Sequence, residues 1–303
     1  MRIPLLNNRA LMIAVTLGVL GSLMWGAHSS VSVFGLRTGL DSFDIAAARV
    51  VGAAFAVIPF LLVRGLSILP PVKQTLWLTL GAGVPFGLLN VAGLQFAPIS
   101  HTGAISLGCV PLATAFAANR FFGDRVSVSH LVALSILVLS LTVIWSTRPF
   151  EWIHVVGDVC FFGSACLWAS YGLNLRRWQL SPVQGMTAIT IGSMPYLLWY
   201  FLAREHTFFS QVDQGLLQVL YQGVVIGVLA VLIYGKVLEM IGPMMGTMFL
   251  AVSPFLIPFM ALLILGQPID TGDVTGLFLV VISMMIAFWK PFDRRKEVVD
   301  GNV

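Results

Sequence analysis

Two pairs of ring-bearing residues, each three positions apart, stand inside apolar runs of this chain. They are Trp25 with His28 and Trp168 with Tyr171. Residues three apart share one face of a helix, so the members of each pair are expected to project together. A large aromatic ring beside a polar one suits a pocket that holds an organic molecule by stacking and a few hydrogen bonds. The alternative is structural: each Trp packs between helices, and His28 bonds a neighbouring carbonyl.

Arg49 is the strongest charge inside an apolar run. It lies about six residues from the start of the run, or roughly 9 Å at about 1.5 Å per residue. Ionisable groups at membrane depth are costly and are functional candidates by default. We expect Arg49 to cluster with His28, Asn90 and the shallower His101, and a guanidinium there favours anionic or zwitterionic ligands because it pairs bidentately with a carboxylate. The alternative is that Arg49 snorkels to the surface and has a structural or topological role.

Further candidates lie in the inner half of the apolar runs, on the opposite side of the membrane from Arg49. Tyr171, Asn174 and Tyr234 are expected to contact the substrate, with interhelical hydrogen bonding as the alternative. Pro111 and Pro254 each remove a backbone hydrogen bond within a span and are expected to act as hinges, although proline is also frequent in membrane helices generally. Small-residue spacing at Gly83 with Gly87, and at Gly223 with Gly227, predicts close helix packing.

The acidic residues show the opposite distribution to Arg49. They fall in loops or near span ends: Asp41, Asp44, Asp124, Glu151, Asp158, Glu205, Asp213, Glu239, Asp270 and Asp273. A carrier of cationic drugs usually needs a deep carboxylate, so this pattern disfavours that activity. If transport is coupled to protons, His28 and His101 are the expected carriers.

The composition requires a membrane to position these residues. Of 303 residues, 58% are hydrophobic and 10% are charged, whereas a soluble domain has about 25% charged residues. Runs of about 20 apolar residues match membrane helices and not the roughly ten-residue strands of barrels. The expected fold is an all-α integral membrane protein with ten spans, near residues 11–33, 43–63, 75–95, 99–119, 127–146, 155–175, 183–203, 215–235, 244–264 and 272–290.

The placement of Lys and Arg predicts the orientation, because cytoplasmic loops retain these residues. With a cytoplasmic N-terminus, thirteen cations are inside: Arg2, Arg9, Arg64, Lys73, Arg120, Arg125, Arg176, Arg177, Lys236, Lys290, Arg294, Arg295 and Lys296. Only Arg37, Arg148 and Arg204 are outside. Both termini are therefore expected in the cytoplasm. Topology accounts for the net charge of +4, and no nucleic-acid partner is expected.

An internal repeat appears at an offset of 143 residues. It matches Trp25 with Trp168, Gly103 with Gly246, Pro111 with Pro254, and Gly123 with Gly266. Five spans per repeat make the second repeat enter the membrane from the opposite side. The expected units are residues 1–148 and 149–303, and inverted repeats of this kind are typical of secondary transporters.

Several stretches resemble the EamA-like branch of the drug/metabolite transporter superfamily. They are Met24-Trp25-Gly26, residues 44–49, residues 98–111, residues 121–125, Leu167-Trp168-Ala169, Ser253-Pro254 and Leu265-Gly266-Gln267. The resemblance covers nearly the whole chain. Two departures occur where the family usually has Glu: Asp124 stands in one repeat and Gln267 in the other.

This resemblance implies ten helices in two inverted repeats and a secondary active or facilitative transporter that works by alternating access. It also implies export of amino acids or similar small metabolites. The alternatives are a multidrug or lipid-linked substrate carrier, or a membrane scaffold or sensor. No enzyme motif is present in the sequence, so neither catalysis nor a cofactor is expected. We expect a monomer or homodimer in the lipid bilayer of a bacterial inner membrane.

Overall fold

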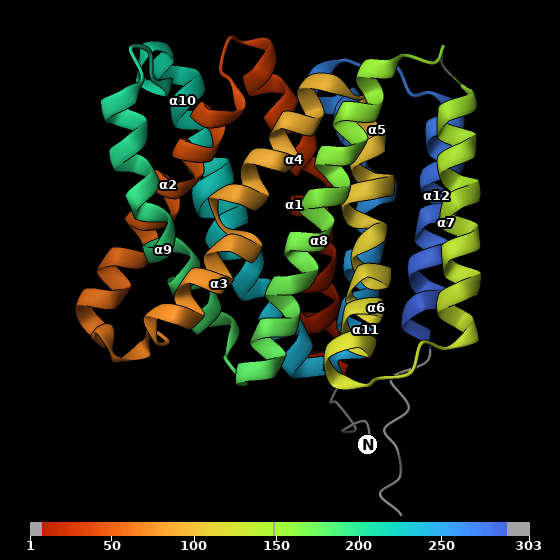
Figure 1. Ribbon diagram of the computed structural model, residues 1–303, viewed down its shortest axis with the longest axis horizontal. Coiled ribbons are helices and arrows are strands. Elements are labelled where there is room, and N and C mark those ends of the chain that lie inside the picture. The colour runs from red at the N-terminus through yellow and green to blue at the C-terminus, as the bar shows by residue number, and fades with distance from the viewer. Residues whose placement is uncertain (1–7, 148, 290–303) are drawn as a thin grey trace, which may run out of the picture.

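The computed structural model of the protein describes residues 8–147 and 149–289. Six cations of the orientation argument lie outside the described residues: Arg2, Arg148, Lys290, Arg294, Arg295 and Lys296. Within the described residues every regular element is a helix, and most helices run along one common direction (Figure 1). The all-α expectation is confirmed.

The first half of the chain contains α1 (Asn8–Arg37), α2 (Ser42–Arg64), a short 3₁₀ turn (Leu66–Ile68), α3 (Val72–Ala82), α4 (Val84–Phe96), α5 (Ile99–His101), η2 (Thr102–Leu107), α6 (Cys109–Phe122) and α7 (Val128–Ser146). The second half contains α8 (Trp152–Trp178), α9 (Pro182–Ala203), η3 (Phe208–Gln211), α10 (Val212–Gln218), η4 (Val219–Ala230), α11 (Val231–Leu265) and α12 (Thr271–Trp289). Of these, η2 and η4 are π-helical.

Among the described residues, eight helical stretches are long and apolar enough to cross a membrane, and two shorter apolar helices follow them. The shorter ones are Ala251–Leu265 and Thr271–Ala287. These ten segments coincide with the ten predicted spans. The boundary between the eighth and ninth segments differs from the prediction, because α11 runs through both.

Polar caps and glycines define the helix ends. Asp41 caps α2 by accepting from Asp44 N at 2.9 Å, and the Asp44 carboxylate accepts from Asp41 N at 2.9 Å. This reciprocal arrangement satisfies backbone donors that a helix start leaves unpaired. Gly123 and Gly266, which are repeat-equivalent, end α6 and α11 with φ of 70° and 64°. Glycine suits both positions because it adopts the left-handed conformation without steric cost.

Three of the spans are irregular in mid-course. The third breaks at Gly83 between α3 and α4, while the fourth and eighth contain η2 and η4. Irregular backbone at membrane depth occurs where it is buried in protein or lines a cavity, and π-helical turns often occur at functional sites. Hydropathy predicted these spans but not their irregularity.

The helices of the two halves pack in equivalent pairs. Helix α1 packs along α11, and its counterpart α8 packs along η2 and α6. Likewise α2 packs on η4 as α9 packs on α3, while α7 lies beside α12 (Figure 1). The internal repeat of the sequence is therefore matched by a repeat in packing.

Candidate functional site

A cavity of about 40 Å³ lies in the interior between α2, α8, α9 and the junction of α3 with α4. Its lining includes Arg49, Trp168, Tyr171, Thr190 and Ser193. Gly83 and Gly227, from two of the irregular spans, also line it. The break in the third span and the π-helix of the eighth therefore adjoin the same space. A cavity at such irregular helices is the arrangement expected of a transporter site.

Arg49 brings an uncompensated positive charge to this cavity. Its guanidinium carbon lies 5.6 Å from the centre of the Phe86 ring. Among the side chains that the structure describes, the ion pairs join acidic groups to other cations, and none of them includes Arg49. A charge held away from water is costly unless something pairs with it. The site therefore has the electrostatics to receive an anionic group.

Aromatic rings form the wall beside Arg49. The Trp168 ring lies 5.4 Å from the Trp25 ring, 5.0 Å from Phe86 and 5.5 Å from Tyr171, measured between centroids. Trp25 is 7% exposed and also meets the edge of the His28 ring at 5.9 Å. The structure therefore brings both predicted ring pairs to one place, one from each half of the chain.

His28 is buried, with 5% of its surface exposed. The Arg49 charge and the side-chain amides of Asn90 and Gln222 lie close to it. Neither ring nitrogen has a hydrogen-bond partner among the described residues. Buried polar atoms usually have partners, so His28 is a candidate ligand-binding residue.

Asn90 completes the predicted polar cluster. Its Nδ2 donates to Ser106 Oγ at 2.8 Å, and Ser106 Oγ lies 2.8 Å from Ser164 Oγ. The other amide atom, Asn90 Oδ1, is buried and has no hydrogen-bond partner among the residues that the structure describes. Asn90 therefore connects the surroundings of His28 to η2 and α8.

His101 differs from the expectation. Its described partners are Asp158, Trp145 and His154, near the start of α8, and it does not line the Arg49 cavity. The reason is that His101 lies in the first turn of the fourth span, Ile99–Phe122, where it meets Asp158 in the second turn of α8. Asp158, which the sequence grouped with span-end acids, is 16% exposed and bonds the buried imidazole.

The remaining predicted residues are dispersed. Tyr171 lines the Arg49 cavity, whereas Tyr234 and Trp25 line a separate space of about 10 Å³. Asn174 is half-buried and lines neither cavity. Pro111 lies in α6 shortly after η2, and Pro254 lies within α11. Their hinge roles stay a prediction.

Four contributors were not predicted from the sequence: Phe86, Thr190, Ser193 and Gln222. Within the described part of the chain, Ser193 Oγ and Gln222 Oε1 are buried without hydrogen-bond partners. Gln218 and Gln222 stand four residues apart in an apolar run, and this spacing is a signal that could have identified Gln222. Phe86 carries no such signal, because Phe is common throughout the chain.

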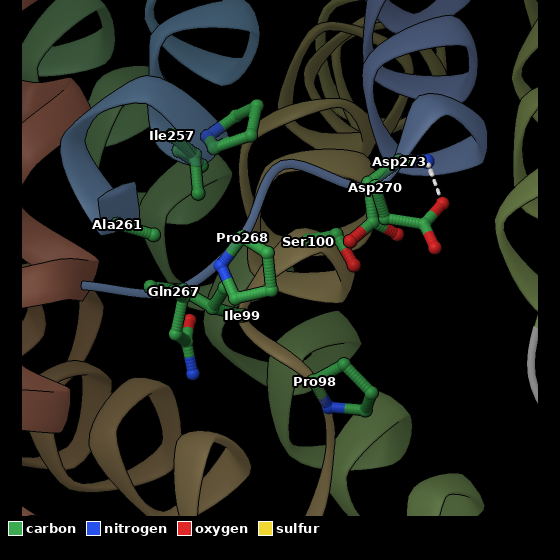
Figure 2. A pocket seen from close by; sticks show the side chains of 10 residues that line it. Pro98, Ile99, Ser100, Ile257, Ala261, Gln267, Pro268, Asp270 and Asp273 are labelled. Atoms are coloured by element: carbon green, nitrogen blue, oxygen red, sulfur yellow. Dashed lines mark hydrogen bonds between the residues drawn. The ribbon is translucent and has the colours of Figure 1, made fainter. Parts of the chain in front are cut away.

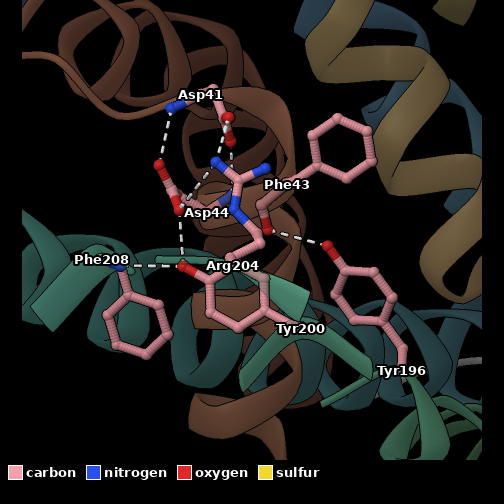
Figure 3. Close-up of polar contacts among 7 residues, drawn as sticks. All are labelled: Asp41, Phe43, Asp44, Tyr196, Tyr200, Arg204 and Phe208. Carbon is pink, nitrogen blue, oxygen red and sulfur yellow. Dashed lines mark hydrogen bonds and ion pairs between the residues drawn. The ribbon is translucent and has the colours of Figure 1, made fainter. Parts of the chain in front are cut away.

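A polar network joins α2 to α9 at the α10 end of the bundle, the upper end in Figure 1. Figure 3 shows Arg204 between Asp41 and Asp44, at 2.5 and 3.9 Å. Although partial burial acts to lower it, the Asp41 and Asp44 carboxylates raise the pKa of Arg204 above its ordinary value. Tyr200 donates to Asp44 Oδ1 at 2.5 Å and accepts from Phe208 N at 2.8 Å. The network therefore links the start of α2 to the end of α9.

Removal of the Tyr200 hydroxyl is expected to destabilise the protein by about 1–3 kcal/mol, because Tyr200→Phe leaves buried groups of Asp44 and Phe208 without a partner. Tyr196→Phe is the matched control, since the Tyr196 hydroxyl donates to the Phe43 carbonyl at a more exposed position. The measurement is the denaturation midpoint in detergent. Equal effects of the two substitutions would contradict the role given to Tyr200.

Two larger cavities open at the same end. One, of about 390 Å³, lies between residues 98–100, the end of α11 and residues 267–273 (Figure 2). The other, of about 400 Å³, shares Pro98, Ile99 and Gln267 with it. At the opposite end, Asp124 pairs with Arg176 at 2.6 Å. The two residues that replace the usual Glu thus lie at opposite ends, one ion-paired and one beside open space.

Known proteins with similar sequences include one that is named a transporter. A family model described as the EamA-like transporter family matches residues 12–146 and 155–289. The WAT1-related protein At1g44800 of Arabidopsis thaliana is 24% identical over 302 residues, covering 86% of this chain and 80% of that protein. The uncharacterized transporter YyaM of Bacillus subtilis (strain 168) is 22% identical over 211 residues, covering 67% and 68%.

A solved structure described only as a crystal structure of protein has a similar fold. It matches with a TM-score of 0.60 and 17% identity, covering 90% of this chain and 96% of that one. At this identity the match supports the fold alone.

Proposed function

This chain belongs to the EamA-like transporter family, an integral membrane family of the drug/metabolite transporter superfamily, and on that premise we propose that it is a secondary carrier that exports carboxylate-bearing metabolites such as amino acids. Transport proceeds by alternating access, driven by a gradient or by exchange. The site is the Arg49 cavity, with Trp25, His28, Asn90, Trp168 and Tyr171 around it.

The observation that carries the proposal is the unpaired Arg49. A substrate carboxylate supplies the counter-charge that the described side chains do not, and a guanidinium binds it through two parallel hydrogen bonds. The aromatic wall of Trp168 and Phe86 takes an apolar side chain. His28, whose ring nitrogens have no hydrogen-bond partner among the described residues, bonds a further polar group of the substrate. The permanent positive charge of Arg49 in the site repels cationic drugs.

Alternating access is supported by the equivalent packing of the two halves. We propose that residues 1–148 and 149–303 are inverted repeats that rock around the Arg49 cavity. The ends with Asp124 and Gln267 are then the inner and outer mouths, and Pro111 and Pro254 let the fourth and ninth spans bend. We further propose that the chain lies in a bacterial inner membrane with both termini cytoplasmic, as a monomer or homodimer.

The test is counterflow in sealed vesicles without ATP. Purified protein is reconstituted into vesicles preloaded with each of the proteinogenic amino acids, and uptake of the same labelled amino acid is measured. We expect exchange of at least one of them, and at least about tenfold weaker competition by its methyl ester, which lacks the carboxylate charge.

Two controls sharpen this test. Protein-free vesicles give the leak, and growth of expressing cells in ethidium tests cation export, for which no protection is expected. Absence of exchange for every amino acid, or equal competition by acid and ester, would contradict the proposed substrate class.

A further inference from the structure

We propose that His101 and Asp158 form the proton-binding site that couples transport to a proton gradient, at a place separate from the substrate cavity. The inference rests on the proposed carrier function and adds its driving ion. Neither residue lines the Arg49 cavity.

The pair is buried and close. His101 is 2% exposed, and its Nδ1 donates to Asp158 Oδ1 at 2.7 Å. The second carboxylate oxygen, Oδ2, accepts from Trp145 Nε1 at 3.1 Å. The His101 ring also lies 5.3 Å from the Trp145 ring and 6.0 Å from the His154 ring. Both carboxylate oxygens of Asp158 are thus bonded, one to the imidazole and one to the indole.

The site spans the two halves of the chain. His101 and Trp145 come from the first half, whereas Asp158 comes from α8 in the second half. Any rocking of one repeat against the other therefore changes the distance between the imidazole and the carboxylate. A proton-binding site can respond to the conformation of the carrier only if the distance between its groups differs between conformations.

The charge of the pair makes it a two-state element. With the imidazole protonated, imidazolium and carboxylate sum to zero, and the packed interface between the halves holds a neutral pair. Loss of one proton leaves a net charge of minus one, which is costly to keep buried. The closed arrangement at this interface therefore favours the protonated pair, and the open, hydrated arrangement favours the deprotonated one.

A second contact links this pair toward the substrate site. Ser106 stands five residues after His101 across the π-helical η2, and Ser164 stands six residues after Asp158 on α8. The wider π-helical turn brings residues five apart to nearly the same face, so both His101 and Ser106 meet α8. Ser106 also accepts from Asn90, beside His28. Movement of η2 on α8 is thereby transmitted to the cavity residues.

Other charged groups near α5 are few among the described residues. On α8, His154 faces His101 and lies 3.8 Å from Glu151. Asp270 and Asp273 line the cavity that Ser100 shares (Figure 2). Arg37 of α1 lines the neighbouring cavity. Within the described part of the chain, only Asp158 forms an ion pair with His101.

The experiment separates coupling from transport. Vesicles containing wild type, His101→Gln or Asp158→Asn are assayed with the amino acid that shows exchange, first in counterflow at uniform pH and then under an imposed pH gradient. We expect gradient-driven accumulation to fall by at least about tenfold in both variants, within the range of coupling between sites. Counterflow should stay within about threefold of wild type, as uncoupled exchange needs no net proton transfer.

A measurement without substrate tests proton binding itself. Infrared difference spectra of the protein in lipid, between about pH 8 and pH 5, should contain an imidazole signal that is lost in His101→Gln and altered in Asp158→Asn. His206→Gln and Asp213→Asn, both exposed, are the matched controls and should leave gradient-driven accumulation unchanged.

The outcomes are distinct. Absence of counterflow in wild type contradicts the carrier function, while the infrared spectra still test the proton site. Counterflow without gradient-driven accumulation in wild type, accumulation by Asp158→Asn at the wild-type level, or unchanged infrared spectra in His101→Gln would each overturn the proton site.

Discussion

Arg49→Gln is expected to reduce counterflow by at least about thirtyfold, since loss of one partner of a buried charge pair costs about 2 kcal/mol or more. The substitution keeps a polar side chain of similar length but removes the charge that pairs with the substrate. Arg49→Lys should retain part of the activity, because an ammonium keeps the charge and loses the bidentate geometry. The measurement is the initial rate of exchange against substrate concentration.

Arg64→Gln is the matched control for this substitution. Arg64 lies at the other end of the same helix α2 and is exposed, so its replacement should leave exchange unchanged. If Arg49→Gln exchanged substrate at the wild-type rate, with protein amount and folding equal, Arg49 would not bind the carboxylate.

Gly52→Ala is expected to lower the free energy of unfolding by about 1–3 kcal/mol, the usual cost of overpacking. A methyl group at Gly52 would collide with the Val219 carbonyl oxygen and would lie 2.9 Å from Gly223 Cα. These are backbone atoms of η4, so no side chain can rotate away and the α2–η4 contact must separate. The loss should appear as a lower denaturation midpoint in detergent.

Gly172→Ala provides the comparison. Gly172 is an exposed residue in α8 with open space where its methyl group would lie, so alanine should leave the midpoint unchanged or raise it slightly through better helix propensity. A similar midpoint for both variants would mean that the α2–η4 contact yields easily. That result would contradict the close packing described here.

The architecture was largely predictable from the sequence. Long apolar runs and the placement of charges are direct consequences of the membrane solvent, and the ten segments follow from them. The irregular parts were not predictable in this way. Gly83 was expected to allow close helix packing, and in the structure it also marks the break of the third span. The π-helical turns of η2 and η4 have no distinct hydropathy pattern.

The candidate site was predictable where residue chemistry is unusual for its surroundings. Trp25 and His28 lie together as expected, and Arg49 and Asn90 lie close to His28. His101 did not join them. Its partner Asp158 is 57 positions away in the sequence, and the periodicity of one span does not show which neighbouring helix a side chain at its end will meet.

The small volume of the Arg49 cavity determines what a binding measurement will mean. At about 40 Å³ it compares with the share of one water molecule in the liquid, about 30 Å³, and ligand pockets start at about 300 Å³. A substrate can therefore bind only to a conformation in which the Arg49 cavity is wider. A measured Kd will then be the intrinsic constant divided by the fraction of molecules in that conformation. A substitution far from Arg49 that favours the wider form would tighten apparent binding without adding a single contact.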